Sequence, residues 1–207
     1  MSTDWFRNTT WNEAVERTFN DNLRRTKRKQ QYLRIQASTL AQSHPEVTLR
    51  LLDQYFELND DFERAQAYVD RARALLELGR LNEAIDSYNA ALAREAEFPR
   101  LQTQAYVDLP YLIATNGIRE KYDRAVQLLE KYEARLAFPV ERFRWHAAYA
   151  LIAAETNDAA SAKVHAQSAL EAAALDHSGF RYHPKTGLVS EAYDDIVRKL
   201  KEYSRRH

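Results

Sequence analysis

The sequence predicts an all-α fold, and three observations carry that prediction. Only four Gly and five Pro interrupt the 207 residues, which is few for the many turns of an all-β protein. The chain is rich in Ala, Leu, Arg and Glu, which favour helices. Spacings of 4, 3, 9, 4 and 3 residues between similar positions also recur along the chain. Because spacings of three and four place side chains on one helical face, each set indicates two helices joined by a tight turn.

These spacings define four helical hairpins. The clearest copy comprises Tyr68, Ala72, Leu75, Ala84, Tyr88 and Ala91. Two more comprise Leu109, Ile113, Asn116, Ala125, Leu129 and Tyr132, and then His146, Ala150, Ala153, Ala162, Ala166 and Ala169. A fainter copy comprises Tyr32, Gln36, Thr39, Thr48, Leu52 and Tyr55. The alanines indicate closely packed helices, so leucine at Ala84 or Ala162 is expected to destabilise the fold.

This pattern resembles the tetratricopeptide repeat, in which large and small residues alternate on the first helix before an alanine and an aromatic residue on the second. The closest copy carries Leu78-Gly79-Arg80-Leu81-Asn82-Glu83-Ala84 at its turn and Pro99 after the hairpin. The resemblance covers about residues 29–176. It implies a right-handed solenoid of four tetratricopeptide-like hairpins with a C-terminal capping helix. A non-repeating helical bundle is the alternative.

Residues 1–28 are predicted to form an N-terminal segment and a helical extension. A capping box at Thr10-Trp11-Asn12-Glu13 begins a helix that is predicted to run without interruption to about Ser43. Pro45 begins the next helix, which ends near Leu58. Asp60 or Asp61 can cap a helix that ends at Gly79.

The central helices are predicted from further proline, glycine and asparagine signals. Predicted spans are 82–94, a helix ending at Asn116-Gly117, 121–136, 139–155 and a last repeat helix ending near Ala174. Pro110 lies inside one of these patterns, so a kink or a late start is expected there.

The C-terminal part is predicted to be a loop at residues 177–187 followed by a capping helix at residues 188–207. An apolar stripe at three- and four-residue spacing supports the helix; it comprises Leu188, Val189, Ala192, Tyr193, Ile196, Val197, Leu200 and Tyr203. In the loop, Phe180, Arg181, Tyr182, His183 and Pro184 form either a recognition patch or, as we prefer, an anchor in which Phe180 and Tyr182 hold the loop against the last hairpin.

Composition and motifs argue against catalysis. Lys plus Arg and Asp plus Glu both number 30, and cysteine is absent. The six histidines lack recognised metal-ligand spacings, and no nucleotide-binding or hydrolase motif is present. We therefore expect no enzyme activity, no cofactor and no metal. The lack of a signal peptide or an apolar span predicts a cytoplasmic protein without membrane contact.

A basic run occupies residues 24–29, and its members are Arg24, Arg25, Thr26, Lys27, Arg28 and Lys29. It would suit nucleic acid or an acidic peptide. The preferred interpretation is a solvated helix face, paired with acidic residues of the neighbouring hairpin: Asp53, Glu57, Asp60, Asp61 and Glu63. Six consecutive helical residues would point in all directions around the helix, which is poor geometry for following a phosphate backbone.

The first helix of each hairpin is expected to line a concave groove. Its predicted lining residues are Gln30, Arg34, Ala37 and Ala41; Gln66, Asp70, Arg73 and Glu77; Val107, Tyr111, Ala114 and Ile118; and Arg144, Ala148, Leu151 and Glu155. The peptide-binding residues that we single out are Arg34, Asp70, Arg73, Glu77, Tyr111, Arg144 and Glu155. In this set the arginines are expected to bind carboxylates of the peptide, and Tyr111 is expected to be an apolar anchor. A mixed surface without a site, with Asp70 and Glu77 neutralising Arg73, is the alternative.

The predicted function is therefore a scaffold or adaptor that binds a protein or peptide in this groove. The alternative is a nucleic-acid-associated regulatory factor that uses the basic run. Neither the partner nor the oligomeric state follows from the sequence.

Overall fold

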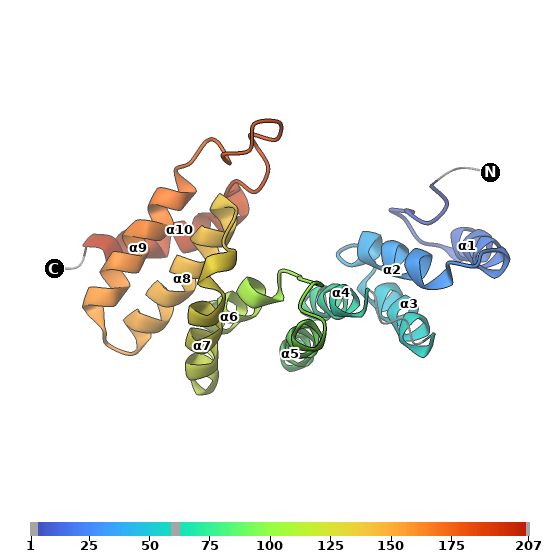
Figure 1. Ribbon diagram of the computed structural model, residues 1–207, viewed down its shortest axis with the longest axis horizontal. Helices are drawn as coiled ribbons and strands as arrows, with labels where there is room; N and C mark the ends of the chain where they lie inside the picture. Colours follow the sequence, from blue (N-terminus) through green and yellow to red (C-terminus); the bar gives the residue numbers. More distant parts are fainter. Residues whose placement is uncertain (1–3, 59–62, 206–207) are drawn as a thin grey trace. The chain divides into compact units, whose positions relative to one another are not determined.

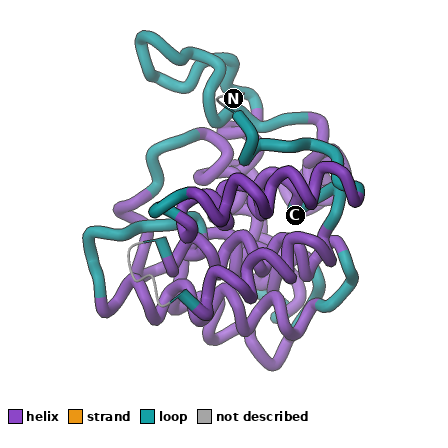
Figure 2. The backbone as a smooth tube through the Cα atoms, turned by 90° about the vertical axis from the view of Figure 1, so that its right-hand side faces the viewer, coloured by secondary structure: helices purple, strands orange, loops and turns teal. Residues whose placement is uncertain are grey.

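The computed structural model describes residues 4–58 and 63–205. Within these residues the chain forms ten α-helices, three short 3-10 helices and no strand. Figure 2 shows helices in purple joined by teal loops. The predicted all-α fold is confirmed. The chain divides into two compact units, Met1–Ala105 and Tyr106–His207, and each is described by itself.

The first unit is built from two helical hairpins and a preceding helix. Its helices are α1 (Glu13–Arg25), α2 (Lys29–Leu40), α3 (Pro45–Glu57), α4 (Arg64–Glu77) and α5 (Leu81–Glu97). Helix α2 packs against α3 and α4 against α5, and α3 also contacts α4 (Figure 1).

The second unit ends in a hairpin that is covered by the last helix. Its elements are α6 (Ala105–Thr115, which begins at the unit boundary), η1 (Arg119–Lys121), α7 (Tyr122–Tyr132), η2 (Glu133–Arg135), α8 (Pro139–Glu155), α9 (Ala159–Ala173), η3 (Glu191–Tyr193) and α10 (Asp194–Arg205). Helix α8 packs along α9, and α10 packs on both (Figure 1).

The prediction of one uninterrupted helix up to Ser43 is wrong. Asn12, not Thr10, caps α1: its Oδ1 accepts hydrogen bonds from the backbone N–H groups of Ala14 and Val15. Helix α1 ends at Arg25 because Thr26 is extended, with φ −98° and ψ 151°, and its Oγ1 accepts a hydrogen bond from the backbone N–H of Arg28. This side-chain bond competes with helical pairing and separates α1 from α2.

Proline and glycine mark most of the other boundaries as predicted. Pro45 and Pro139 occupy the first positions of α3 and α8. Gly79 and Gly117 follow α4 and α6 with φ of 69° and 62°, a left-handed conformation that glycine adopts without strain. The helix around Pro110 does not start late, since α6 begins at Ala105. The predicted caps Asp60 and Asp61 lie outside the described residues.

The repeat positions form the core of both units. Most are buried, including Ala72, Ala84, Ala91, Ala125, Ala150, Ala162, Ala166 and Ala169. Two polar members of the faintest copy, Gln36 and Thr48, are also buried. Thr48 donates to the backbone carbonyl of Ala37, and the Gln36 amide exchanges hydrogen bonds with Asn8. Because these hydrogen bonds pair the buried polar groups, Gln36 and Thr48 can occupy core positions.

The capping helix is shorter than predicted. Residues 188–190 are not helical, η3 follows, and α10 begins only at Asp194. Within α10, Leu200 and Tyr203 are buried and Ile196 and Val197 are half-buried, as the apolar stripe predicts.

Candidate functional site

In the first unit, Arg34 of α2 joins two carboxylates, that of Glu63 just before α4 and that of Asp70 in the middle of α4. Its Nε donates to Glu63 at 2.9 Å and its Nη1 donates to Asp70 at 3.2 Å. The Asp70 carboxylate also accepts hydrogen bonds from Gln66 at 3.1 Å and from the Ser38 hydroxyl at 3.3 Å. We call these five residues the Arg34 cluster.

Burial decides the electrostatics of the Arg34 cluster. Asp70 is only 1% exposed, and its burial raises the pKa of the carboxyl although Gln66 and Arg34 act in the opposite direction. Burial opposes the charge of Arg34, but Glu63 and Asp70 outweigh it and raise the pKa of the guanidinium. Because internal donors already surround the Asp70 carboxylate, its predicted contact with a ligand is not supported by its position.

Beside this cluster lies a surface pocket of about 220 Å³. It is lined by Glu63, Ala65, Gln66, Arg100, Leu101, Gln102 and Thr103. Its wall is fixed at Thr103, whose backbone N–H and hydroxyl both donate to Glu95, at 2.8 and 2.6 Å. Most of its lining residues have polar side chains, and two of them, Glu63 and Gln66, belong to the Arg34 cluster.

Two other predicted residues of this unit, Arg73 and Glu77, are exposed on α4. The positive charge of Arg73 favours the ionised form of Asp70, which lies three residues earlier on the same helix. Arg73 and Glu77 therefore lie at the surface, whereas Asp70 on the same helix is buried.

In the second unit, Arg144 of α8 is the centre of a cluster with aromatic walls. Its Nη1 donates to Asp108 of α6 at 2.6 Å, and its Nε donates to the Tyr193 hydroxyl of η3, also at 2.6 Å. The guanidinium lies over the rings of Tyr111 and Tyr193, 5.8 and 5.3 Å from their centroids. Phe143 meets Tyr193 edge-on with ring centroids 5.1 Å apart. We call these five residues the Arg144 cluster.

The Arg144 cluster is largely withdrawn from solvent. Burial raises the pKa of the Tyr111 phenol well above its usual range. Burial disfavours the charge of Arg144, yet Asp108 outweighs that effect and keeps the pKa of the guanidinium above its usual value. The arginine therefore stays charged and binds Asp108 and Tyr193 together.

Glu155, the last predicted site residue, lies in a separate contact. Its carboxylate accepts hydrogen bonds from the Tyr122 hydroxyl at 2.7 Å and from Arg119 Nε at 3.2 Å. The hydrogen bond from Tyr122 is the main cause that lowers the pKa of Glu155, whereas burial raises the pKa of Tyr122 to about 12.

Three ion pairs join residues that are 36 positions apart. They are Arg34 with Asp70, Asp108 with Arg144, and Arg119 with Glu155. Each pair lies within one unit. The same sequence distance therefore brings charges together in both units.

The expectation that the first helices expose a whole face to a groove is wrong at many positions. Ala37, Ala41, Asp70, Val107, Ala114, Ala148 and Leu151 are buried. In the second unit the reason is the C-terminal segment: η3 contacts Arg144, and α10 packs on α8. Sequence reasoning also missed Glu63, Asp108 and Tyr193 as partners of the arginines, although the 36-residue spacing of opposite charges is a signal for Asp108.

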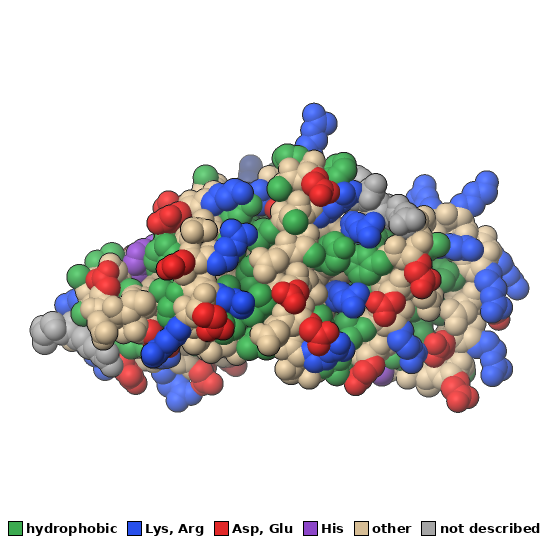
Figure 3. Space-filling model, turned by 90° about the horizontal axis from the view of Figure 1, so that it is seen from below, with side chains coloured by type: hydrophobic (Ala, Val, Ile, Leu, Met, Phe, Trp, Pro, Cys, Tyr) green, Lys and Arg blue, Asp and Glu red, His purple; other side chains and the backbone are tan. Residues whose placement is uncertain are grey.

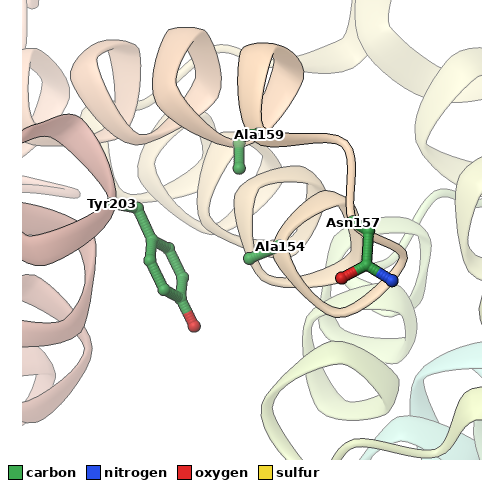
Figure 4. Close-up of a pocket in the computed structure, with 5 residues that line it drawn as sticks. Ala154, Asn157, Ala159 and Tyr203 are labelled. Carbon is green, nitrogen blue, oxygen red and sulfur yellow. The ribbon is translucent and has the colours of Figure 1, made fainter. Parts of the chain in front are cut away.

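A second pocket, of about 150 Å³, lies among α8, α9 and α10. Its lining residues are Ala154, Asn157, Ala159, Ala162 and Tyr203. Figure 4 shows the Tyr203 ring from α10 opposite the α8–α9 turn that carries Ala154, Asn157 and Ala159. Small side chains leave this space between closely spaced helices.

Two histidines of the second unit, His146 and His165, form a pair. His146 and His165 place their Nδ1 atoms 3.0 Å apart, and Tyr149 stacks on His165 with ring centroids at 4.6 Å. Burial lowers the pKa of His146 to about 4. Among the residues that the structure describes, no group of three or more His, Cys, Asp or Glu side chains could hold a metal ion.

The loop at residues 177–187 is closed by its own hydrogen bonds. Buried Ser178 donates from its backbone N–H to Pro184 and from its hydroxyl to His183, both at 2.8 Å. Phe180 packs against Phe138 with ring centroids 5.0 Å apart, as the predicted anchor requires. Tyr182 is 80% exposed, so its predicted role in holding the loop is wrong.

Neither a family model, nor a curated protein, nor a solved structure matches this chain. None of the helices that the structure describes has the length and apolar character needed to cross a membrane.

Proposed function

We propose that the protein is a scaffold of tetratricopeptide-like hairpins that binds an extended segment of a protein partner on the first helices of its hairpins. The packing of α2 with α3, α4 with α5 and α8 with α9 supports the hairpins. The buried alanines and the ion pairs 36 residues apart support a repeating arrangement. Right-handed solenoid geometry is part of this proposal.

One observation carries the binding proposal: the chain places Tyr193 of its own η3 segment on the first helices of the second unit. Residues 188–190 lead into η3, with Ser190 extended at φ −101° and ψ 170°. Tyr193 then contacts Tyr111 of α6 and Phe143 and Arg144 of α8. Tyrosine and arginine are the residues that most often dominate binding interfaces. The Arg144 cluster is thus built like a peptide subsite with an internal occupant.

In the first unit the corresponding surface is open. Arg73 and Glu77 are exposed on α4, and the polar pocket beside the Arg34 cluster offers Gln66, Arg100 and Gln102. We propose that a partner segment uses this surface with polar contacts. The predicted set of peptide-binding residues includes members of both units, among them Arg73 and Tyr111, and it stays a prediction. The cytoplasmic location and the lack of enzyme activity stay predictions too.

A peptide supplied in trans tests the binding surface directly. The probe is a fluorescent peptide of residues 186–197, and the receptor is the full chain carrying Tyr193→Ala, which removes the internal occupant's ring. We expect binding that weakens at least about fivefold when Arg144→Met or Tyr111→Ala is added, the size of effect typical of an interface hot spot. Fluorescence anisotropy measures it.

Two controls make the result specific. The same peptide with alanine at the position of Tyr193 should bind more weakly, and Arg124→Ala, an exposed change on α7, should leave binding unchanged. If the alanine peptide bound as well as the original, the surface would not recognise segments of this kind and the proposal would be wrong.

A further inference from the structure

The basic run forms an exposed corner between two helices. Arg24 and Arg25 end α1, Lys27 and Arg28 lie in the connection, and Lys29 begins α2. All five side chains are exposed. We call these five residues the basic corner. Figure 3 shows Lys and Arg side chains gathered over the end of the first unit that holds α1.

The break at Thr26 changes how these charges are presented. A continuous helix would distribute six successive side chains around its whole circumference. Instead, the extended Thr26 residue ends α1, and a new helix begins three residues later. The geometric objection to a polyanion site, which assumed a continuous helix, therefore does not apply.

The charges of the basic corner are not neutralised by the acidic residues expected to pair with them. Asp53 binds Arg71 at 3.0 Å, and Glu63 binds Arg34. Glu57 forms no ion pair with the corner within the described residues, and Asp60 and Asp61 lie outside them. In the corner itself, Arg24 binds Asp21 at 3.2 Å.

The remaining four cations of the corner have no carboxylate partner among the residues that the structure describes. They are Arg25, Lys27, Arg28 and Lys29. Elsewhere the chain pairs its arginines with nearby acids, as at Arg34, Arg71, Arg80, Arg119 and Arg144. Although the net charge of the whole chain is zero, the basic corner therefore carries an excess of positive charge. Repulsion among the four cations is relieved when a polyanion binds.

The surroundings of the corner select the kind of polyanion. A membrane-surface helix needs exposed apolar side chains that enter the bilayer, and a protein interface usually centres on buried apolar or aromatic anchors. The exposed large hydrophobic side chains of the described chain are Leu58, Phe98, Val164, Leu175, Phe180 and Tyr182, none of them in α1, α2 or their connection. Binding to a phosphate backbone needs only positive charges, because released counterions supply the free energy.

We propose that the basic corner binds the phosphate backbone of nucleic acid without reading its sequence. Arginine offers planar paired donors and lysine a compact charge, and both suit phosphate oxygens. This site is independent of the peptide-binding surface proposed above, since it uses none of its residues.

Salt dependence of binding tests the proposal with the full-length protein. The probes are a labelled 20-base-pair DNA duplex and a labelled 20-nucleotide RNA, titrated at about 50 to 200 mM salt. For duplex DNA, log K should fall with log salt with a slope of about −0.9 for each phosphate contacted. Neutralising Arg25, Lys27 and Arg28 to Gln should make that slope less negative by about 2.7 and weaken binding at least tenfold.

A matched variant carries the same loss of charge elsewhere. Arg124, Lys199 and Lys201 are also exposed, and their change to Gln should leave duplex binding within about twofold. Circular dichroism and thermal melting verify that both triple variants are folded. Equal weakening by the two variants, or no measurable binding of either nucleic acid, would refute the proposal.

Two further probes separate the other anionic partners. Vesicles containing about 30% anionic lipid and a polyglutamate peptide are titrated under the same conditions. The proposal expects both to bind more weakly than the duplex. Binding of vesicles or polyglutamate at least as tight as that of the nucleic acids would assign the corner to a different partner and overturn it.

Discussion

The Arg34 and Arg144 clusters differ in a way that bears on function. In each, an arginine binds an aspartate 36 residues away. Polar side chains complete the first cluster, and an open polar pocket lies beside it. Aromatic rings complete the second, and Tyr193 covers it. The same spacing thus lies beside an open pocket in the first unit and under an aromatic side chain in the second.

The difference shows that the same 36-residue spacing of an arginine and an aspartate does not determine which side chains surround the ion pair. The ion pair joins neighbouring helices in both clusters, whereas the residues around it set the access. Substitutions in the core of one unit, and changes of pH, should therefore alter the stability of the two units by different amounts.

The largest expected effect comes from weakening the packing of α10 on α8 and α9 in the second unit. Leu200 of α10 is fully buried, so Leu200→Ala removes buried methyl groups and leaves a cavity, which typically costs 2–5 kcal/mol. We expect the second unit to unfold at lower urea, which hydrogen exchange of α8 and α9 measures. The first unit, reported by hydrogen exchange of α4 and α5, should not change. Equal destabilisation of both units would show that they unfold as one.

The packing of alanines gives an intermediate effect that separates the units. Ala84 of α5 is fully buried, and Ala84→Leu should cost about 1–3 kcal/mol because the helices must move apart. Ala162 of α9 lines the pocket of about 150 Å³, so Ala162→Leu can fill existing space and should cost less. Thermal melts of the two variants measure the difference. If Ala162→Leu destabilised the protein more than Ala84→Leu, the pocket could not accept the larger side chain and this prediction would be wrong.

The smallest effect is a pH dependence with opposite signs in the two units. His146 has a folded pKa of about 4 against about 6.5 when unfolded, so the unfolded state binds more protons between these values. The stability of the second unit should therefore fall as pH drops from 7 to 5, by about 1 kcal/mol after allowance for partial exposure. The groups that face the histidine pair are Tyr149, Asp158 and Glu133.

Asp70 should act in the other direction. Its raised pKa means that the folded state holds a proton more tightly than the unfolded state, so acidification favours folding of the first unit. Urea titrations at pH 7 and 5, with His146→Leu as the control for the second unit, measure both trends. Identical pH dependence in His146→Leu and the unchanged protein would exclude the histidine pair as the cause.

Local signals predicted much of the fold. Pro45 and Pro139 start helices, Gly79 and Gly117 follow them, and buried alanines recur where the repeat spacing places them. These features depend on backbone conformation and on the periodicity of one helix, which the sequence states directly. The break at Thr26 was missed because a single side-chain hydrogen bond outweighs several good helix formers around it.

The candidate site was predicted less well, because its residues are far apart in the sequence. Arg34, Tyr111 and Arg144 were identified as important, but as residues awaiting a ligand. Tyr193 lies 49 residues after Arg144, and the intervening loop decides whether they meet. The pattern of one helix gives the direction of a side chain; it does not state which distant segment will lie over it.

Gly187, in the connection to the last helix, lies where no other residue fits without strain. It adopts φ of 70°, and a Cβ atom there would lie 2.5 Å from the ring of Phe138, while its carbonyl accepts a hydrogen bond from Val140 at 2.8 Å. Between this fixed point and Ser178 the chain closes on itself, with Tyr182 at its tip. For protein engineering, the loop tip is thus a suitable attachment point for a dye or an affinity handle, whereas any side chain at position 187 would disturb the path into the cover.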